Sequence, residues 1–190
     1  MGTGRLEAFS DGVIAIIITI MVLGLRVPES TDLAALKPLV PVFLSYVLSF
    51  VYIGIYWNNH HHLLQAVDQV NGPILWANLH LLFWLTLIPF TTAWMGENHF
   101  AAWPTAIYGL VLLLAATAYF ILARAFIALH GKSSALARAL GHDFKNKISA
   151  LLYALAIPLA FVYSWLADAL YVAVAILWLL PDPRIEKNLG

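Results

Sequence analysis

Six apolar segments, all close to the length of a membrane-spanning helix, constrain this chain more than any other feature of its sequence. A helix that crosses the hydrocarbon core of a bilayer needs about 20 mostly apolar residues. The segments are residues 6–25, 39–64, 73–94, 103–130, 147–164 and 167–180. The composition agrees, because 62% of the residues are hydrophobic and only 11% are charged. We therefore expect an all-α, polytopic membrane protein.

The last two apolar segments leave two interpretations open. Residues 167–180 would form a helix of about 21 Å at about 1.5 Å per residue, which is short for a full crossing. Either both segments cross the membrane, or they form one broken, re-entrant pair. We expect six full spans, all within a single domain that comprises residues 1–190.

Basic residues set the expected orientation. With six spans both chain ends lie on one side of the membrane, and most Lys and Arg residues near the ends of the spans fall on that side. They are Arg5, Lys132, Arg138, Lys145, Lys147, Arg184 and Lys187, whereas the opposite side receives Arg26 and Lys37. Because positively charged loops stay in the cytoplasm, we expect a multi-pass protein of the cell membrane with both termini cytoplasmic.

Several function classes lack their usual sequence signals. Ten basic and ten acidic residues balance, so no charge bias points to nucleic acid, and the absence of cysteine excludes thiolate sites. The chain has no glycine-rich phosphate loop, no His-Glu-x-x-His motif and no serine nucleophile elbow. It also lacks a Gly-Tyr-Gly filter and an arginine-rich voltage sensor. We expect neither an enzyme nor a resident cofactor.

The first segment carries an apolar stripe. On a helix, Ile16, Ile20 and Leu23 fall on one face, with Thr19 beside them. Such a stripe can line a narrow pore, or it can simply pack against neighbouring helices. Because isoleucine-rich stripes are common in membrane spans, the pattern alone favours packing.

Three consecutive histidines, His60, His61 and His62, end the second segment. Successive side chains on a helix point about 100° apart, so the three cannot bind one ion together. Metal pairs on helices are spaced i, i+3 or i, i+4, and no acidic residue near His80 completes a site. We expect no metal site here, and hydrogen bonds from these histidines to neighbouring helices instead.

A motif in the first segment resembles a known family. The chain reads Arg5-x3-Phe9-Ser10-Asp11-Gly12, then Ala15-Ile16, Thr19 and Leu23; Trp57 and His60-His61 follow in the second segment, and Asn78 and Pro89-Phe90-Thr91 in the third. Together these residues resemble the transmembrane protein 175 family, which comprises potassium channels of endosomes and lysosomes with prokaryotic relatives. The resemblance covers roughly residues 5–92, and beyond them only topology and length match.

The resemblance implies a pore. Family members have six spans per repeat, and prokaryotic members carry one repeat, assemble as homotetramers and line the central pore with the first helix. The resemblance implies that the pore has no backbone-carbonyl filter and that its narrowest point is an apolar ring. By motif position this constriction maps to Ile16, with Ile20 and Leu23 as further apolar layers and Thr19 as a hydroxyl ring near it.

The resemblance also implies a polar network at the cytoplasmic end of the first helix. Its members would be Arg5, Phe9, Ser10, Asp11, Trp57, His60, His61 and Asn78, and which histidine of residues 60–62 joins it is open. Such a network would bias a tilt or rotation of the first helix, because histidine titrates near neutral pH.

The function implied is a cation channel with weak to moderate potassium selectivity. A proton-coupled secondary transporter is the alternative, because it would use membrane-embedded Asp and His residues equally well. A metal-dependent membrane enzyme and a structural subunit are more distant alternatives. The expected partners are further copies of the chain, membrane lipid and permeant monovalent cations, potassium above all, with no nucleic acid.

Overall fold

The computed structural model describes residues 2–131 and 144–179, and within these ranges every regular element is a helix. The elements are α1 (Gly4–Val22), the 3-10 helix η1 (Leu33–Leu39), α2 (Val40–Gln65), α3 (Gly72–Thr86), α4 (Ile88–Glu97), α5 (Ala102–His130), α7 (Phe144–Leu159) and α8 (Ser164–Leu179). The prediction of an all-α fold is confirmed. Four basic residues used for the expected orientation, Lys132, Arg138, Arg184 and Lys187, lie outside the described residues.

The third apolar segment differs from the single helix that its sequence predicts. It forms two helices, α3 and α4, which are separated at Leu87. Pro89 lies in the first turn of α4. Proline lacks the backbone N–H that would continue the α3 ladder, and its ring crowds the preceding turn, so the helix is interrupted there.

Within the described residues, three apolar segments are long enough to cross a membrane: Leu33–Gln65, Gly72–Glu97 and Ala102–His130. Helix α1 is shorter and carries Arg5, Glu7 and Asp11 within its 19 residues. Helix α8 is apolar, but its 16 residues extend only about 24 Å at about 1.5 Å per residue. The chain is therefore that of a membrane-embedded helical protein, and the six full crossings stay a prediction.

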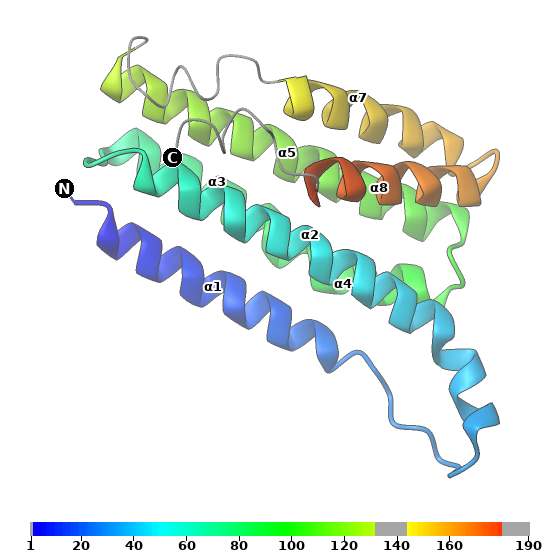
Figure 1. Cartoon of the computed structure of the whole chain (residues 1–190). Coiled ribbons are helices and arrows are strands. Elements are labelled where there is room, and N and C mark those ends of the chain that lie inside the picture. Colours follow the sequence, from blue (N-terminus) through cyan, green and yellow to red (C-terminus); the bar gives the residue numbers. More distant parts are fainter. Residues whose placement is uncertain (1, 132–143, 180–190) are drawn as a thin grey trace.

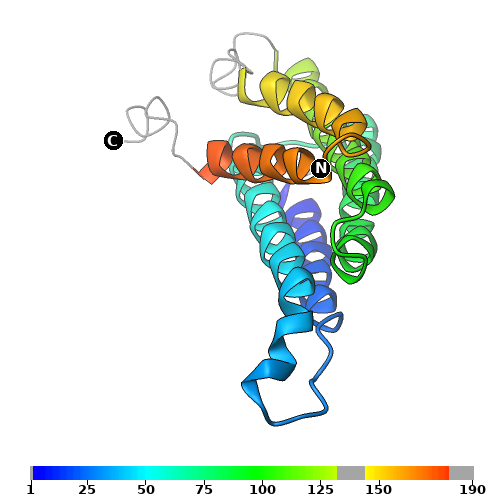
Figure 2. The same cartoon turned by 90° about the vertical axis from the view of Figure 1, so that its right-hand side faces the viewer.

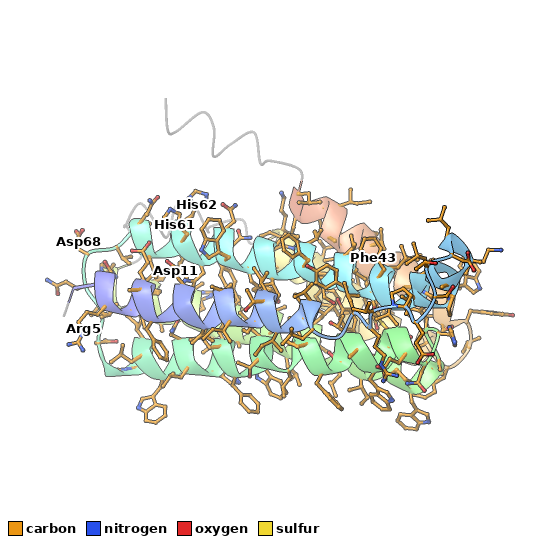
Figure 3. The ribbon with its side chains drawn as sticks, turned by 90° about the horizontal axis from the view of Figure 1, so that it is seen from below. Arg5, Asp11, Phe43, His61, His62 and Asp68 are labelled. Carbon is orange, nitrogen blue, oxygen red and sulfur yellow. The ribbon has the colours of Figure 1, made fainter. Side chains whose placement is uncertain are left out.

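Helix α1 lies at the edge of the bundle. It contacts α2, α3 and α4, whereas α7 packs on α5 and α8 at the opposite edge (Figures 1 and 2). Seen from below in Figure 3, α1 lies in front of α2 and the α3–α4 pair. One side of α1 is therefore covered by its own chain, and the other side is open.

The helices behind α1 are held together by buried hydroxyl groups and a close backbone approach. Ser49 Oγ on α2 lies 2.6 Å from Thr92 Oγ1 on α4 and 3.0 Å from Tyr108 Oη on α5. At Gly96 on α4, an added Cβ would lie 2.7 Å from Cα of Val42 on α2, so only glycine fits. Helices α2, α4 and α5 thus form a tightly packed support for α1.

Tyrosine side chains fix α8 to the same support. Tyr52 on α2 donates a hydrogen bond of 2.6 Å to the backbone oxygen of Tyr171 on α8. Tyr171 in turn donates to the backbone oxygen of Thr105 on α5, at 3.0 Å, and its hydroxyl lies directly over Gly109. These contacts fix α8 against α2 and α5.

Candidate functional site

Helix α1 has one buried face that docks it on α2, α3 and α4. Five residues on this face are buried, spaced four, four, three and four residues apart. They are Leu6, Ser10, Ile14, Ile17 and Met21. This spacing places them on a single stripe of the helix. The stripe fixes the rotation of α1 about its axis and so decides which residues it turns outward.

The opposite face of α1 carries the residues expected to line a pore. Ile16 is 58% exposed, Ile20 49% and Leu23 79%, and Thr19 lies on the same open side. A contiguous exposed apolar stripe of this kind marks a surface that faces lipid, another chain or a narrow apolar passage. The packing interpretation that the pattern alone favours therefore does not hold within one chain.

The hydroxyl group of Thr19 donates its hydrogen bond within its own helix. Thr19 Oγ1 lies 2.9 Å from the backbone oxygen of Ile16 and 3.1 Å from that of Ala15. Because both contacts are to carbonyl oxygens, the hydroxyl proton is directed into the helix. The Thr19 oxygen is thus left as an acceptor on the exposed face.

Three polar side chains form a buried chain of hydrogen bonds between α1, α3 and α2. Ser10 Oγ donates to the Leu6 backbone oxygen at 2.8 Å and accepts a bond of 2.9 Å from Asn78 Nδ2. Asn78 Oδ1 lies 2.7 Å from His60 Nε2. Because this amide oxygen only accepts, His60 carries a proton on Nε2. Ser10, Asn78 and His60, which we call the buried triad, are at most 1% exposed.

A second polar group lies beside the buried triad and is partly open to solvent. Trp57 Nε1 on α2 donates to Asp11 Oδ1 on α1 at 3.0 Å, and His61 Nδ1 lies 3.0 Å from Glu7 Oε1. The Trp57 and His61 rings stack, with centroids 6.0 Å apart. Figure 3 shows Asp11 and His61 at the same end of the bundle. The predicted network is therefore divided into two groups, one buried and one half-exposed.

Glu7 is the site residue that the sequence prediction missed. It lies four residues before Asp11, and residues at this spacing share a helix face. That spacing, together with the neighbouring histidines on α2, is the signal that could have identified it. The contacts also show where each of the three histidines lies. His60 is hydrogen-bonded to Asn78, His61 is hydrogen-bonded to Glu7, and His62 is exposed.

Arg5 and Phe9 do not join either group within one chain. Arg5 is exposed, and among the described residues it has no hydrogen bond or ion pair; Figure 3 places it apart from Asp11. Phe9 is 52% exposed, and its position turns it toward the same side as Ile16. Both side chains lie on the open face of α1.

The histidines do not assemble a metal site in the part of the chain that is described. Among residues 2–131 and 144–179, no three His, Asp or Glu side chains come together in a way that could hold a metal ion. His60 and His61 each direct a ring nitrogen at a different helix, His60 at α3 and His61 at α1. The histidine run therefore joins helices.

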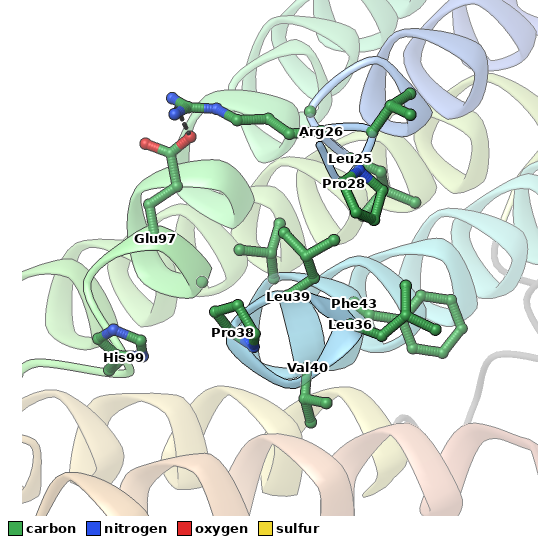
Figure 4. A pocket seen from close by; sticks show the side chains of 14 residues that line it. Leu25, Arg26, Pro28, Leu36, Pro38, Leu39, Val40, Phe43, Glu97 and His99 are labelled. Atoms are coloured by element: carbon green, nitrogen blue, oxygen red, sulfur yellow. Dashed lines mark hydrogen bonds and ion pairs between the residues drawn. The ribbon is translucent and has the colours of Figure 1, made fainter. Parts of the chain in front are cut away.

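A pocket of about 810 Å³ lies at the opposite end of α1, beyond its last turn (Figure 4). The segment that follows α1 forms one wall, and η1, α2 and the end of α4 form the others. Arg26 lies at the rim, 3.1 Å from Glu97 on α4. This ion pair ties the α1–α2 connection to α4 across the pocket.

A second cavity, of about 340 Å³, lies beside the last turn of α1 and shares Gly24, Leu25 and Val42 with the first pocket. Ile20 of α1 and Leu23, the residue that caps α1, line it. The two ends of α1 therefore differ. Its N-terminal half, which we call the held end, contacts the buried triad and the half-exposed polar group. Its C-terminal end borders the two cavities.

Comparison with known proteins identifies relatives of this chain. The family described as endosomal/lysosomal potassium channel TMEM175 matches residues 5–89. This range contains all of α1 except its first residue, all of α2 and α3, and every predicted site residue. A potassium channel of Chryseobacterium sp. (strain P1-3) is 56% identical over 189 residues, which cover 100% of this chain and 98% of the relative. A potassium channel of Streptomyces collinus is 38% identical over 128 residues, which cover 62% of this chain and 61% of the relative.

A solved structure has the same fold. The crystal structure of a lysosomal potassium-selective channel TMEM175 homolog from Chamaesiphon minutus superimposes with a TM-score of 0.80 at 30% sequence identity. The match covers 93% of this chain and 95% of the solved chain. The likeness thus extends well beyond residues 5–89, into the helices whose sequences carry no recognisable motif.

Proposed function

The chain belongs to the TMEM175 family, and from this premise we propose that it forms a potassium channel whose pore is lined by α1. One observation carries the proposal: α1 buries one face against its own chain and leaves an apolar face open. Assembly as a homotetramer would bring four copies of this open face around a central axis. The single domain of residues 1–190 would then be one quarter of the channel.

In this arrangement Ile16 would form the narrowest ring, with Ile20 and Leu23 as further layers. A narrow apolar throat excludes water and offers no ligands to replace an ion's hydration shell. Potassium holds its water less tightly than sodium, so partial dehydration costs it less. We therefore expect weak to moderate potassium selectivity, with the free acceptor of Thr19 as a nearby polar ring.

The unequal ends of α1 support a gating movement. The buried triad and the Trp57–Asp11 contact hold the first half of α1, whereas Ile20 and Leu23 border the cavity of about 340 Å³. A tilt of α1 about its held end would displace its far end, where Ile17 and Met21 would repack against the neighbouring helices. Such a tilt would widen the apolar throat and allow water to enter it.

We expect the held end of α1 to face the cytoplasm, because most of the basic residues near the ends of the spans fall on that side. Arg5, Lys145 and Lys147 would share that side with both termini, and Arg26 and Lys37 would lie outside. The channel would reside in the cell membrane, where exposed aromatic side chains such as Trp76, which is 74% exposed, would contact lipid. It would need no cofactor and would act on permeant monovalent cations.

Ion flux through purified protein in liposomes tests the proposal. We expect flux that follows the electrochemical gradient, several-fold faster for potassium than for sodium, with caesium also permeant, and unitary current steps in a planar bilayer. A proton-coupled transporter would instead give saturable flux that depends on an imposed proton gradient. Flux of that second kind, or no flux, would contradict a channel.

A further inference from the structure

The pocket of about 810 Å³ beyond the last turn of α1 has no part in the proposed conduction pathway. We propose that it binds an acyl chain of a membrane phospholipid with a zwitterionic headgroup, and that Arg26 and Glu97 at its rim bind that headgroup. This lipid pocket goes beyond the proposed function, because lipid binding can be measured without any ion flux.

The walls of the lipid pocket suit a hydrocarbon chain. They are mainly apolar, and the side chains that line it include Leu25, Leu36, Leu39, Val40 and Phe43. Figure 4 shows Leu25 and Pro28 on one side of the space and Leu39 on the other. A volume of about 810 Å³ lies within the range of about 300–1,000 Å³ that is usual for ligand sites with mostly apolar walls and a few polar groups.

The rim of the lipid pocket lies at the ends of the helices. Glu97 is the last residue of α4, and Arg26 follows the end of α1 by four residues. Helices that cross a bilayer end near its headgroup region, so this ion pair is at the depth of lipid headgroups. The wall residues Val40 and Phe43 belong to the first turns of α2, which leads from the rim into the hydrocarbon region. Phe43 is 52% exposed, so the apolar wall continues onto the outer surface.

The charges at the rim favour a zwitterionic headgroup. Arg26 Nη2 lies 3.1 Å from Glu97 Oε1, and the two side chains are 79% and 45% exposed. Such an exposed ion pair contributes little to stability, so a ligand can separate it at little cost. The guanidinium group can then bind two oxygens of a phosphate, and the carboxylate can bind the ammonium group of phosphatidylethanolamine. Phosphatidylglycerol has no ammonium group and would leave Glu97 without a partner.

The connection between α4 and α5 adds a strained segment to the pocket wall. His99 lines the pocket, and His99 and Phe100 have φ angles of 52° and 58°. Residues other than glycine rarely adopt this left-handed conformation, and residues that do so cluster at ligand sites. Figure 4 shows His99 on the same side of the pocket as Glu97. The imidazole therefore adds a hydrogen-bonding group to the polar side of the pocket.

Lipid titration of the purified, lipid-depleted protein tests the pocket, with binding counted by native mass spectrometry and followed by melting temperature. The two lipids are dioleoyl phosphatidylethanolamine and dioleoyl phosphatidylglycerol, which have the same acyl chains. We expect a single phosphatidylethanolamine to bind each chain, several-fold more tightly than phosphatidylglycerol, and to raise the melting temperature. Leu39→Trp should weaken the binding of both lipids by about tenfold or more, because the indole would fill space that the chain needs. Leu44→Trp, at an exposed α2 position that does not line the pocket, should bind both lipids like the wild type.

Glu97→Gln tests headgroup recognition at an exposed position where folding is not at risk. It removes the partner of the ammonium group and releases Arg26 for the phosphate, so the preference for phosphatidylethanolamine over phosphatidylglycerol should fall to about one. Glu29→Gln is the matched control. Glu29 is an exposed glutamate of the same connection and does not line the pocket, so the preference should stay at its wild-type value.

Several results would overturn the lipid pocket. Equal lipid binding by Leu39→Trp and the wild type is one, and an unchanged headgroup preference in Glu97→Gln is another. A wild-type protein that binds no lipid, together with loss of the oligomer in Leu39→Trp, would assign the pocket to a second copy of the chain. If Leu39→Trp without lipid melts far below the wild type, the headgroup preference of Glu97→Gln alone decides between these outcomes.

Discussion

Replacement of Ile16 by Asn is expected to raise the potassium conductance of the reconstituted protein by about tenfold or more, since removal of about 1.4 kcal/mol from a barrier changes a rate tenfold. In the proposed tetramer the substitution would place four amide groups at the narrowest ring. These amides would hold water in a throat that otherwise excludes it. Selectivity for potassium over sodium should fall at the same time, because a wetted throat lets both ions keep more of their hydration.

The substitution should leave folding intact, because Ile16 is 58% exposed and most changes at exposed positions have small effects on stability. Ile121 on α5 is a matched control, since it is also an exposed isoleucine, at 43%, on a different face of the subunit. Ile121→Asn should leave conductance unchanged. If Ile16→Asn has wild-type conductance in liposomes, Ile16 does not form the constriction.

Replacement of Asn78 by Ala is expected to lower the free energy of unfolding by about 2–4 kcal/mol, because buried polar groups left without partners cost about 1–3 kcal/mol each. Asn78 donates to Ser10 and accepts from His60, so its removal leaves both groups unpaired. The melting temperature in detergent should fall by about 5–15 °C on the scale typical of chains of this size. Because the triad joins α1 to α2 and α3, tetramer recovery should fall as well.

Asn58→Ala provides the matched control for this loss. Asn58 lies two residues before His60 on α2 and is exposed, so its amide can hydrogen-bond to water. The control should melt within about 1–2 °C of the wild type, as is usual for a surface substitution. If Asn78→Ala has the same melting temperature as Asn58→Ala and the wild type, the buried triad does not hold α1 in place.

The sequence indicates the exposed apolar face of α1, but it does not indicate how the polar residues beside that face are grouped. The stripe of Ile16, Ile20 and Leu23 follows from helical spacing alone, and all three lie on the exposed side of α1. Whether a stripe faces a pore or a neighbouring helix depends on what covers it, which spacing within one segment does not specify. The family motif was needed to choose between these two interpretations.

The division of the polar network depends on tertiary packing. His60 and His61 are adjacent in sequence, but a turn of about 100° between them directs one at Asn78 on α3 and the other at Glu7 on α1. Which helix lies in each direction follows from the arrangement of α1, α2 and α3. The arrangement of these helices also leaves Arg5 on the open face, without a partner among the described residues.

The break between α3 and α4 is another feature that the sequence alone did not specify. Pro89 lies within the third apolar segment, but proline in a membrane helix can either bend the helix or interrupt it. Here the helix ends at Thr86 and a new one begins at Ile88. Close packing of Gly96 against Val42 holds α4 on α2, a tertiary contact between residues 54 positions apart in the chain.

Thiol modification of α1 tests the central claim, that its open face lines the pore, most directly. The chain has no cysteine, so a cysteine introduced at Leu23, which is 79% exposed, would be the single target of a positively charged, water-soluble thiol reagent. Phe83→Cys on α3, at a position 55% exposed and expected to face lipid, is the control. We predict that the reagent abolishes most potassium flux through Leu23→Cys and leaves Phe83→Cys and the wild type unaffected. Full flux through the modified Leu23→Cys protein, with labelling verified by mass spectrometry, would contradict a pore lined by α1.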